Sequence, residues 1–255
     1  MLSVICPIYN EAKYIDVCVQ SILLQDYPKQ QLEVLFVDGM SKDGTRDIVN
    51  NYSKQYPFIR LLNNEKRIVP VAMNIGIKAS IGDIVMRLDA HAQYPPNYFS
   101  VLVKELVRLR ADNVGVACKT DVLNKTSKTL AIREVLSNRF GVGNSTFRLG
   151  VDKVIEVDTV PFGCWKKDVF NKYGFYDERL IRNQDIELNK RIVRGGGHIF
   201  IVPDTYCTYL ARETFDGLAK NNFGNGKWNI LTVYYTKQFK SLSVRHFIPL
   251  LFLLS

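Results

Sequence analysis

This sequence of 255 residues has little of what marks the special classes of protein. Nine prolines and sixteen glycines are too few for a low-complexity chain, and 47% hydrophobic residues exclude a disordered one. The five cysteines are odd in number and include no C-x-x-C pair, and there are only three histidines. These counts argue against a disulfide scaffold and against a structural zinc site. We therefore expect one large domain with reduced, mostly buried cysteines.

Long hydrophobic runs are scarce as well. The apolar stretch 2–6 begins directly after Met1 with no basic segment ahead of it, which argues against a signal peptide. Residues 247–254 are nearly all apolar, but a bilayer takes about 20 such residues. We expect either a short docked tail or the start of a transmembrane segment that the sequence cuts off. The second case would place the domain at the cytoplasmic face of the plasma membrane.

The charge is positive and unevenly spread. The formal net charge is +9, and the part of the chain after Asp216 has five basic residues and no acidic one. A basic surplus can serve nucleic acid, a membrane surface or a phosphate-bearing substrate. Three of these basic residues lie just before the apolar run, as the positive-inside rule requires of a cytoplasmic flank. They are Lys237, Lys240 and Arg245.

Apolar runs alternate with helical spacing in the first half of the chain. Strands bounded by helices of about a dozen residues predict a parallel sheet covered on both faces. The predicted strands are 2–7, 32–37, 59–62, 84–88 and 114–118, and the predicted helices are 14–24, 45–55, 69–79 and 96–110. The second half is less regular. It predicts helices at 128–138 and 185–194 and strands at 154–160 and 199–202.

The ends of three predicted strands carry chemically distinctive residues. Open parallel sheets bind ligands at the carboxyl ends of their strands. These ends read Pro-Ile-Tyr-Asn-Glu (7–11), Val-Asp-Gly-Met-Ser-Lys-Asp-Gly-Thr (37–45) and Arg-Leu-Asp-Ala-His (87–91). Their carboxylates suit a ribose, a base or a metal ion. The competing interpretation is that the two Asp-Gly pairs form turns and helix caps.

In their order and spacing these motifs resemble family 2 of the nucleotide-sugar glycosyltransferases. Further likeness comes from 72–77 before Gly82-Asp83, and from 175–178 before 183–188. The Asp-Ala-His variant most resembles the branch that builds bacterial exopolysaccharides such as succinoglycan. The resemblance implies the GT-A fold, an α/β architecture with a Rossmann-like, mixed, mostly parallel sheet and helices on both faces.

The resemblance covers about residues 1–230 and implies that two parts of the chain bind the two substrates. Residues 1–119 would form the nucleotide-sugar-binding half and 120–230 the acceptor half. Residues 231–255 would be a basic and apolar tail where a membrane-anchoring region starts.

The resemblance also implies roles for individual residues. Asp185 would be the catalytic base, and Asp89 with His91 would stand at the family's metal motif. Asp38 would accept a hydrogen bond from the uracil imide. The donor-binding set would be Pro7, Tyr9, Glu11, Asp38, Asp43, Lys66, Arg67 and Asp89. The acceptor-side set would be Trp165, Gln184 and Trp228.

The implied reaction is an inverting transfer of a sugar from a nucleotide, with UDP preferred, to an acceptor hydroxyl. It needs one base to take the proton of that hydroxyl, and a divalent ion on the departing diphosphate. We expect Mn²⁺ to be favoured over Mg²⁺ because His91 replaces a carboxylate. The acceptor would be a lipid-linked saccharide in extracellular or capsular polysaccharide synthesis.

This sequence departs from the family pattern at two places. Gln184 replaces the Glu that usually precedes the base, which removes a like charge beside Asp185. Of the Gln-x-x-Arg-Trp motif of processive members, only a basic residue and Trp228 remain. That difference favours addition of a single sugar.

Plainer structural roles stay open for several of these residues. Asp185 could be the N-cap of the helix that follows it. His91 could be a surface-loop histidine, and Trp165 could be a core residue. The glycine-rich segment 141–144 lacks the strand-before, helix-after context of a phosphate-binding loop.

Two other functions compete with sugar transfer. A dinucleotide-dependent oxidoreductase would share the early periodicity, but no G-x-G-x-x-G follows the first strand. A basic nucleic-acid-binding protein would explain the net charge of +9. No recognition motif of such a protein is present, and we expect no nucleic acid partner.

Overall fold

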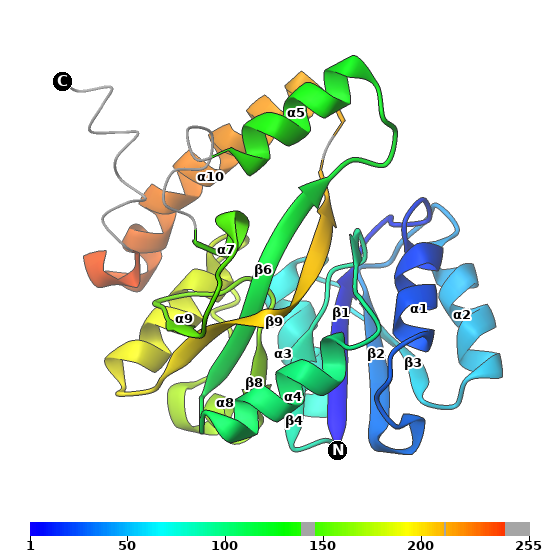
Figure 1. Cartoon of the computed structure of the whole chain (residues 1–255), viewed down its shortest axis with the longest axis horizontal. Coiled ribbons are helices and arrows are strands. Elements are labelled where there is room, and N and C mark those ends of the chain that lie inside the picture. Colours follow the sequence, from blue (N-terminus) through cyan, green and yellow to red (C-terminus); the bar gives the residue numbers. More distant parts are fainter. Residues whose placement is uncertain (139–145, 212, 243–255) are drawn as a thin grey trace.

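Residues 2–87 supply the four strands at one side of the sheet, as their apolar runs predict (Figure 1). The computed structural model describes residues 1–138, 146–211 and 213–242. Parallel pairing joins the strands β1 (Leu2–Ile8), β2 (Leu32–Asp38), β3 (Ile59–Asn63) and β4 (Ile84–Arg87). They alternate with the helices α1 (Ile15–Leu23), α2 (Thr45–Gln55) and α3 (Val69–Ala79). A short 3₁₀ helix, η1 (Lys29–Gln31), precedes β2.

The chain from residue 92 onward extends the sheet with one long parallel pair and several short antiparallel strands. Its strands are β5 (Ala92–Gln93), β6 (Asn113–Asp121), β7 (Ile155–Glu156), β8 (Cys164–Lys166) and β9 (Ile199–Leu210). Its helices are α4 (Tyr98–Arg108), α5 (Ser127–Ser137), α7 (Thr146–Leu149), α8 (Asp168–Tyr173), α9 (Gln184–Arg194) and α10 (Phe215–Thr236), followed by η2 (Phe239–Ser241). The strand order is β3-β2-β1-β4-β8-β6-β9-β5, and β7 pairs with β9. β8 is antiparallel to both β4 and β6, so the sheet is mixed.

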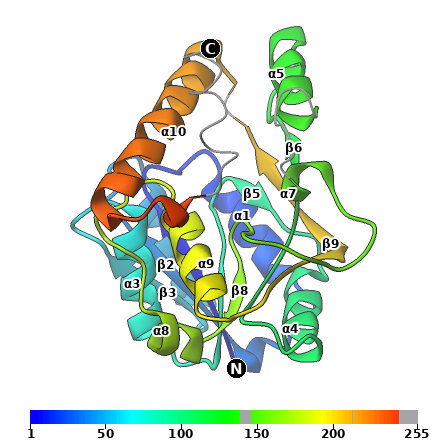
Figure 2. The ribbon, with the colours of Figure 1, turned by 90° about the vertical axis from the view of Figure 1, so that its left-hand side faces the viewer.

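Helices cover both faces of this sheet (Figure 2). Because side chains alternate along β1, one face of the sheet receives Leu2, Val4, Cys6 and Ile8. The helices α1, α2 and α4 pack on that face. Ile5 points to the other face, where α3, α8 and α9 pack. Because successive side chains of a strand point to opposite faces, a strand that is apolar throughout must be covered on both sides. The predicted layered arrangement is therefore confirmed.

The elements of the second half were predicted less well. The predicted strand 154–160 is reduced to Ile155–Glu156, and the strand predicted at 199–202 continues to Leu210. The short β8 and the 22-residue helix α10 were not predicted. A three-residue strand has no periodicity to detect, and α10 carries asparagines and glycines in place of an ordinary apolar stripe.

All five cysteines are buried and free, as their apolar surroundings predicted. No helix within the described ranges is both long and apolar enough to cross a membrane. The glycine-rich segment 141–144 and the apolar run 247–254 lie outside the described residues.

The packing of α3 on β1 gives a test of this fold. A Cβ atom added at Gly76 would lie 2.5 Å from Cγ2 of Ile5, which is buried in the sheet. We expect Gly76→Ala to lower the free energy of unfolding by about 1–3 kcal/mol, because overpacking a filled core strains it. Urea denaturation measures the change. Gly226→Ala is the matched control, since a Cβ there meets nothing within 4 Å and alanine favours a helix. Equal stability of the Gly76→Ala variant and the wild type would contradict the close contact.

Candidate active site

The loops that follow β1 and β2 are bound to each other by side chains of the second loop. The backbone N–H of Asn10 donates to Ser41 Oγ at 2.8 Å, and that of Glu11 donates to Thr45 Oγ1 at 2.8 Å. The N–H of Ala12 donates to Asp43 Oδ2 at 3.0 Å. The Ser, Asp and Thr of the second strand-end motif therefore fix the Asn-Glu-Ala segment (10–12) that ends the first.

Asp43 also caps the start of α2. Its carboxylate accepts from the backbone N–H and the hydroxyl of Thr45. Desolvation acts to raise the pKa of Asp43, but the hydrogen bonds from Thr45 and Ala12 outweigh it and lower the pKa below its ordinary value. The capping interpretation of this Asp-Gly pair therefore describes what Asp43 does in the fold. Asp43 does not line the cavity described below.

Asp38 does not line this cavity either. Its side chain is fully buried, accepts from the N–H and hydroxyl of Ser41, and forms an ion pair with Arg46 at 2.5 Å. The residues on either side of it, Val37 and Gly39, line the cavity instead. The sequence led us to expect Asp38 at the uracil. The structure places its carboxylate under the loop, where it holds the Gly-Met-Ser turn.

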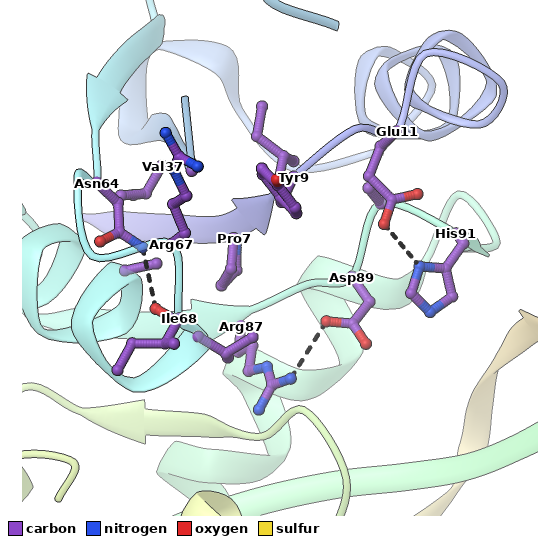
Figure 3. Close-up of a pocket in the computed structure, with 15 residues that line it drawn as sticks. Pro7, Tyr9, Glu11, Val37, Asn64, Arg67, Ile68, Arg87, Asp89 and His91 are labelled. Atoms are coloured by element: carbon purple, nitrogen blue, oxygen red, sulfur yellow. Dashed lines mark hydrogen bonds and ion pairs between the residues drawn. The ribbon is translucent and has the colours of Figure 1, made fainter. Parts of the chain in front are cut away.

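A cavity of about 150 Å³ lies at the carboxyl ends of β1, β2 and β4 (Figure 3). Six of the residues that the sequence singled out line it: Pro7, Tyr9, Glu11, Arg67, Asp89 and His91. A neighbouring hollow of about 310 Å³ shares Tyr9, Glu11 and His91 with it and continues past Tyr14 to Tyr209. Together they make an extended groove along this edge of the sheet.

Tyr9 and Arg67 lie on one side of the cavity in Figure 3. The Tyr9 ring is about half exposed and packs on Gly39, where an added Cβ would come within 3.0 Å of it. Arg67 has a φ of 58°, a left-handed conformation that costs energy for a residue with a Cβ. An exposed ring beside a cation suits a nucleobase and its phosphates.

Arg87 lies at the floor of the cavity and was not predicted as a site residue. Its side chain is only 7% exposed, and Nη2 donates to Asp89 Oδ1 at 3.2 Å. Its Nε and Nη1 make no hydrogen bond with the described residues. Burial alone would lower the pKa of this guanidinium, but the carboxylates of Asp89 and then Asp185 raise it above its ordinary value. Arg87 therefore places a permanent positive charge beside Asp89, the expected metal ligand, and its pKa also responds to Asp185, the expected base.

His91 and Glu11 face each other across the groove. His91 Nδ1 lies 3.3 Å from Glu11 Oε1, and the imidazole makes edge contacts with Tyr14 and Tyr209. Within the described ranges, no cluster of three His, Cys, Asp or Glu side chains forms a complete metal site. Asp89 and His91 do line the same cavity. One carboxylate and one imidazole fit a divalent ion that shares its remaining positions with oxygen atoms of a substrate.

Two motifs that are about a hundred residues apart meet on α3. Asn74 Nδ2 donates to the Tyr176 carbonyl oxygen at 3.0 Å and to Glu178 Oε1 at 3.1 Å, and the Tyr176 N–H donates back to Asn74 Oδ1. Lys66 pairs with Glu178 at 3.0 Å. Lys66 therefore stabilises the 175–178 loop through this ion pair and does not line the cavity. These bonds tie the expected donor half to the segment that leads into α9.

Asp185 lies in the first turn of α9, in a second cavity of about 360 Å³. The N-cap of α9 is Asn183, with a φ of 60°, so Asp185 is not the N-cap; its Oδ1 accepts from the N–H of Ile186. Gln184 also lines this cavity, and its Oε1 is buried without a hydrogen-bond partner among the described residues. Arg182, Asn225 and Asn229 complete the polar lining. The arrangement presents a carboxylate among side-chain amides.

Neither tryptophan of the acceptor-side set lines any of the three hollows described above. Trp165 is 1% exposed and packs against Phe170 and Tyr176 in the core. It cannot stack on a sugar in this position, so the core interpretation holds. Trp228 lies on α10, half-buried, with its ring stacked on Tyr235 at 6.3 Å.

Sequence reasoning missed Arg87, Asn64 and the asparagines of α10. Arg87 stands inside a strand-end motif, where a basic residue in an apolar run was itself a signal. Asn64 lines the first cavity, and its Nδ2 donates to the Ile68 carbonyl oxygen at 3.0 Å. For the asparagines of α10, only the spacing of three to four residues in a helix could have indicated a shared face.

Comparison with known protein families gives one match across most of the chain. The family described as "Glycosyl transferase family 2" matches residues 3–174. A dolichyl N-acetyl-α-D-glucosaminyl phosphate 3-β-D-2,3-diacetamido-2,3-dideoxy-β-D-glucuronosyltransferase of Methanococcus voltae is 28% identical over 88% of this chain and 71% of its own length. The succinoglycan biosynthesis protein ExoA of Rhizobium meliloti is 29% identical over 88% of this chain and 67% of its own length. The expected likeness to the exopolysaccharide branch is thus confirmed.

Solved structures share the fold. The crystal structure of S. aureus TarS 1-349 in complex with UDP-GlcNAc superposes with a TM-score of 0.64 at 19% identity. The structure of GalNAc-T7 with UDP, GalNAc and Mn²⁺ gives a TM-score of 0.64 at 18% identity. They match 84% and 83% of this chain, which spans 59% and 44% of theirs. The predicted GT-A fold is confirmed.

The buried charge of Arg87 gives a testable consequence. We expect Arg87→Met to lower the free energy of unfolding by about 3 kcal/mol, because removing one partner of a buried ion pair leaves the other uncompensated. Urea denaturation with linear extrapolation measures it. Arg133→Met is the control: Arg133 pairs with the exposed Glu134, and such surface pairs contribute about 0–1 kcal/mol. If both variants unfold at the same urea concentration as the wild type, Arg87 does not balance Asp89.

Proposed function

The chain belongs to glycosyltransferase family 2, and from that premise we propose that it transfers a sugar from a UDP-sugar to a hydroxyl of a lipid-linked saccharide, with inversion. The observation that carries the proposal is that Asp89 and Asp185 line two separate cavities, each bordered by polar side chains. One cavity can hold a nucleoside diphosphate and the other an acceptor. The proposal replaces the oxidoreductase alternative, which shares only the layered α/β architecture.

The donor would occupy the first cavity and its continuation. Tyr9 offers a ring face for the base, and Arg67 offers a cation for the phosphates. Arg87 also lines this cavity, and its Nε and Nη1 have no hydrogen-bond partner among the described residues, so its guanidinium is a donor available to phosphate oxygens. The crystal structure of TarS with UDP-GlcNAc supports a UDP-linked donor for this fold. Residues 1–119 would thus form the donor half.

The acceptor would occupy the second cavity, with Asp185 as the base. An inverting transfer needs one carboxylate that takes the proton of the attacking hydroxyl. The buried, unpartnered Gln184 Oε1 suits a hydroxyl donor, and the amides of Asn225 and Asn229 can donate and accept. Together with Arg182, these side chains give a polar lining that suits the hydroxyl groups of a saccharide. Residues 120–230 would form the acceptor half.

The names of the relatives support a lipid-linked acceptor. The Methanococcus protein is named for transfer to a dolichyl-phosphate-linked sugar, and ExoA for succinoglycan biosynthesis. We therefore place the reaction at a membrane surface, on the cytoplasmic side where nucleotide sugars are available. The basic and apolar tail from residue 231 would provide the membrane attachment.

A divalent ion would be held by Asp89 and His91. When bound, the ion supplies positive charge to the departing diphosphate. Arg87 keeps Asp89 in place, and Glu11 faces the imidazole of His91. Since Mn²⁺ accepts imidazole more readily than Mg²⁺ does, we propose Mn²⁺ as the preferred ion.

Asp185→Asn tests the proposed reaction. A UDP-sugar that raises the melting temperature identifies the donor, because a ligand that binds only the native state stabilises it. With that donor we expect kcat to fall by about 10²–10⁴-fold, the usual loss of a general base, while UDP affinity is unchanged. Asp168→Asn, another acidic residue in the first turn of a helix, is the control. A variant that keeps more than about a tenth of the activity would exclude Asp185 as the base.

The choice of metal ion gives a second test. We expect UDP to bind more tightly with Mn²⁺ than with Mg²⁺ in calorimetric titrations, and His91→Asp to reverse the order because a carboxylate suits Mg²⁺. Activity with each ion should follow the same order. His198→Asp is the control, since His198 pairs with Glu156 away from the groove. Identical Mn²⁺/Mg²⁺ ratios in wild type and His91→Asp would show that His91 does not bind the ion.

A further inference from the structure

Helix α10 turns a polar face toward the rest of the protein. The residues of this face recur every three or four positions: Asn221, Asn225, Asn229, Thr232 and Thr236. Arg182 Nη1 donates to the side-chain oxygens of Asn221 and Asn225 at 2.9 and 2.7 Å. Asn183 Nδ2 donates to Asn229 at 3.0 Å and to Thr232 at 3.3 Å. Contact with the protein is therefore made by hydrogen bonds.

The opposite face of α10 carries its large apolar side chains. Phe223, Ile230 and Tyr234 are 78%, 58% and 61% exposed, and Lys227 lies among them. At 100° per residue these four positions fall within one narrow stripe, on the far side of the helix from the asparagines. Figure 2 shows α10 along the upper left border of the molecule.

This distribution is the reverse of that in an ordinary surface helix. A helix on a water-soluble protein buries its apolar stripe against the core and exposes its polar face. Burial of apolar area is the main source of packing free energy, and α10 leaves that area unused in water. Contiguous exposed apolar side chains of this kind mark a surface that meets another apolar phase.

The charge around the stripe indicates what that phase is. The cations on or beside the stripe are Lys220, Lys227, Lys237 and Lys240, and Asp216 is the last acidic residue of the sequence. Lys237 Nζ lies 4.2 Å from the centre of the Tyr234 ring. Aromatic and aliphatic side chains bordered by lysines are typical of helices that lie in the headgroup region of an anionic membrane. A partner protein that packed its own apolar surface against the stripe would not require this excess of positive charge.

We propose that the Phe223-Ile230-Tyr234 stripe of α10 is a membrane-binding surface that inserts into the headgroup region of an anionic bilayer. This rests on the proposed function in one respect, namely that the acceptor is lipid-linked. The two faces of α10 then have related roles, because Asn225 and Asn229 on the inner face line the cavity that contains Asp185. A helix is about 10–12 Å across, so the bilayer surface would lie about that distance from the cavity.

Vesicle sedimentation tests the surface. The full chain is mixed with vesicles of phosphatidylcholine containing phosphatidylglycerol, and with vesicles of phosphatidylcholine alone. We expect the wild type to bind the anionic vesicles, and the triple variant Phe223→Ser, Ile230→Ser, Tyr234→Ser to bind at least about tenfold more weakly, because the apolar area that enters the interface is lost. Both proteins keep residues 243–255, so the difference reports on α10.

The matched control is a triple variant at equally exposed apolar residues elsewhere. Leu24→Ser, Ile81→Ser, Val107→Ser changes side chains that are 61–69% exposed, and we expect it to bind vesicles like the wild type. Circular dichroism and UDP affinity show that each variant is folded. The proposal is overturned if the α10 variant binds anionic vesicles as tightly as the wild type, or if the wild type binds neutral vesicles equally well.

Two further readouts separate this proposal from its alternatives. If the wild type sediments as a dimer without lipid and the α10 variant as a monomer, the stripe is a self-association surface and the proposal is wrong. Transfer to a water-soluble saccharide should be unaffected in the α10 variant, since the inner face is intact. If the wild type binds no nucleotide sugar, the proposed function fails, while the vesicle result still decides the role of the stripe.

Discussion

The buried guanidinium of Arg87 is the interaction on which the candidate site depends. A sheet edge that gathers carboxylates at its strand ends would repel itself, and the low-dielectric interior would make that repulsion costly. Arg87 is nearly inaccessible to solvent, pairs with Asp89 and also acts on Asp185. Its charge is independent of pH in any physiological range. One residue of β4 thus supplies a fixed positive charge at the edge of the sheet where these carboxylates lie.

Around this charge the loops are fixed by their own side chains. Ser41, Asp43 and Thr45 hold the backbone after β1, and Asn74 holds the backbone before α9. These bonds are made by the protein's own side chains, which fix the backbone of the loops at the groove. Substrates bound to such a groove lose less affinity to the ordering of loops.

The sequence predicts this molecule well wherever a single rule decides the outcome. Parallel strands bring their carboxyl ends to one edge, and for that reason Tyr9, Asp89 and His91 lie together in one cavity although they belong to different motifs. Asp38 shows where the rule stops. A strand-end carboxylate can turn toward a ligand or beneath its own loop, and only the position of Arg46 decides between them.

Other features depend on tertiary contacts that no local pattern encodes. Trp165 belongs to the three-residue strand β8, whose antiparallel insertion between β4 and β6 buries its ring. The asparagines of α10 form a face only because Arg182 and Asn183, about forty residues earlier, lie opposite them. In both cases the sequence shows which amino acids are present, but only the folded structure shows which residues they contact.

The burial of the cysteines has a practical consequence for spectroscopy. All five thiols are inaccessible, and burial raises the pKa of Cys6 and Cys164 above the ordinary value, which suppresses the reactive thiolate. Maleimide probes will therefore leave the native thiols of the folded chain unmodified. A single cysteine engineered at an exposed position can carry a fluorophore or a spin label without first removing the native ones. Distances between the two cavities can then be followed during turnover in a protein whose core is unaltered.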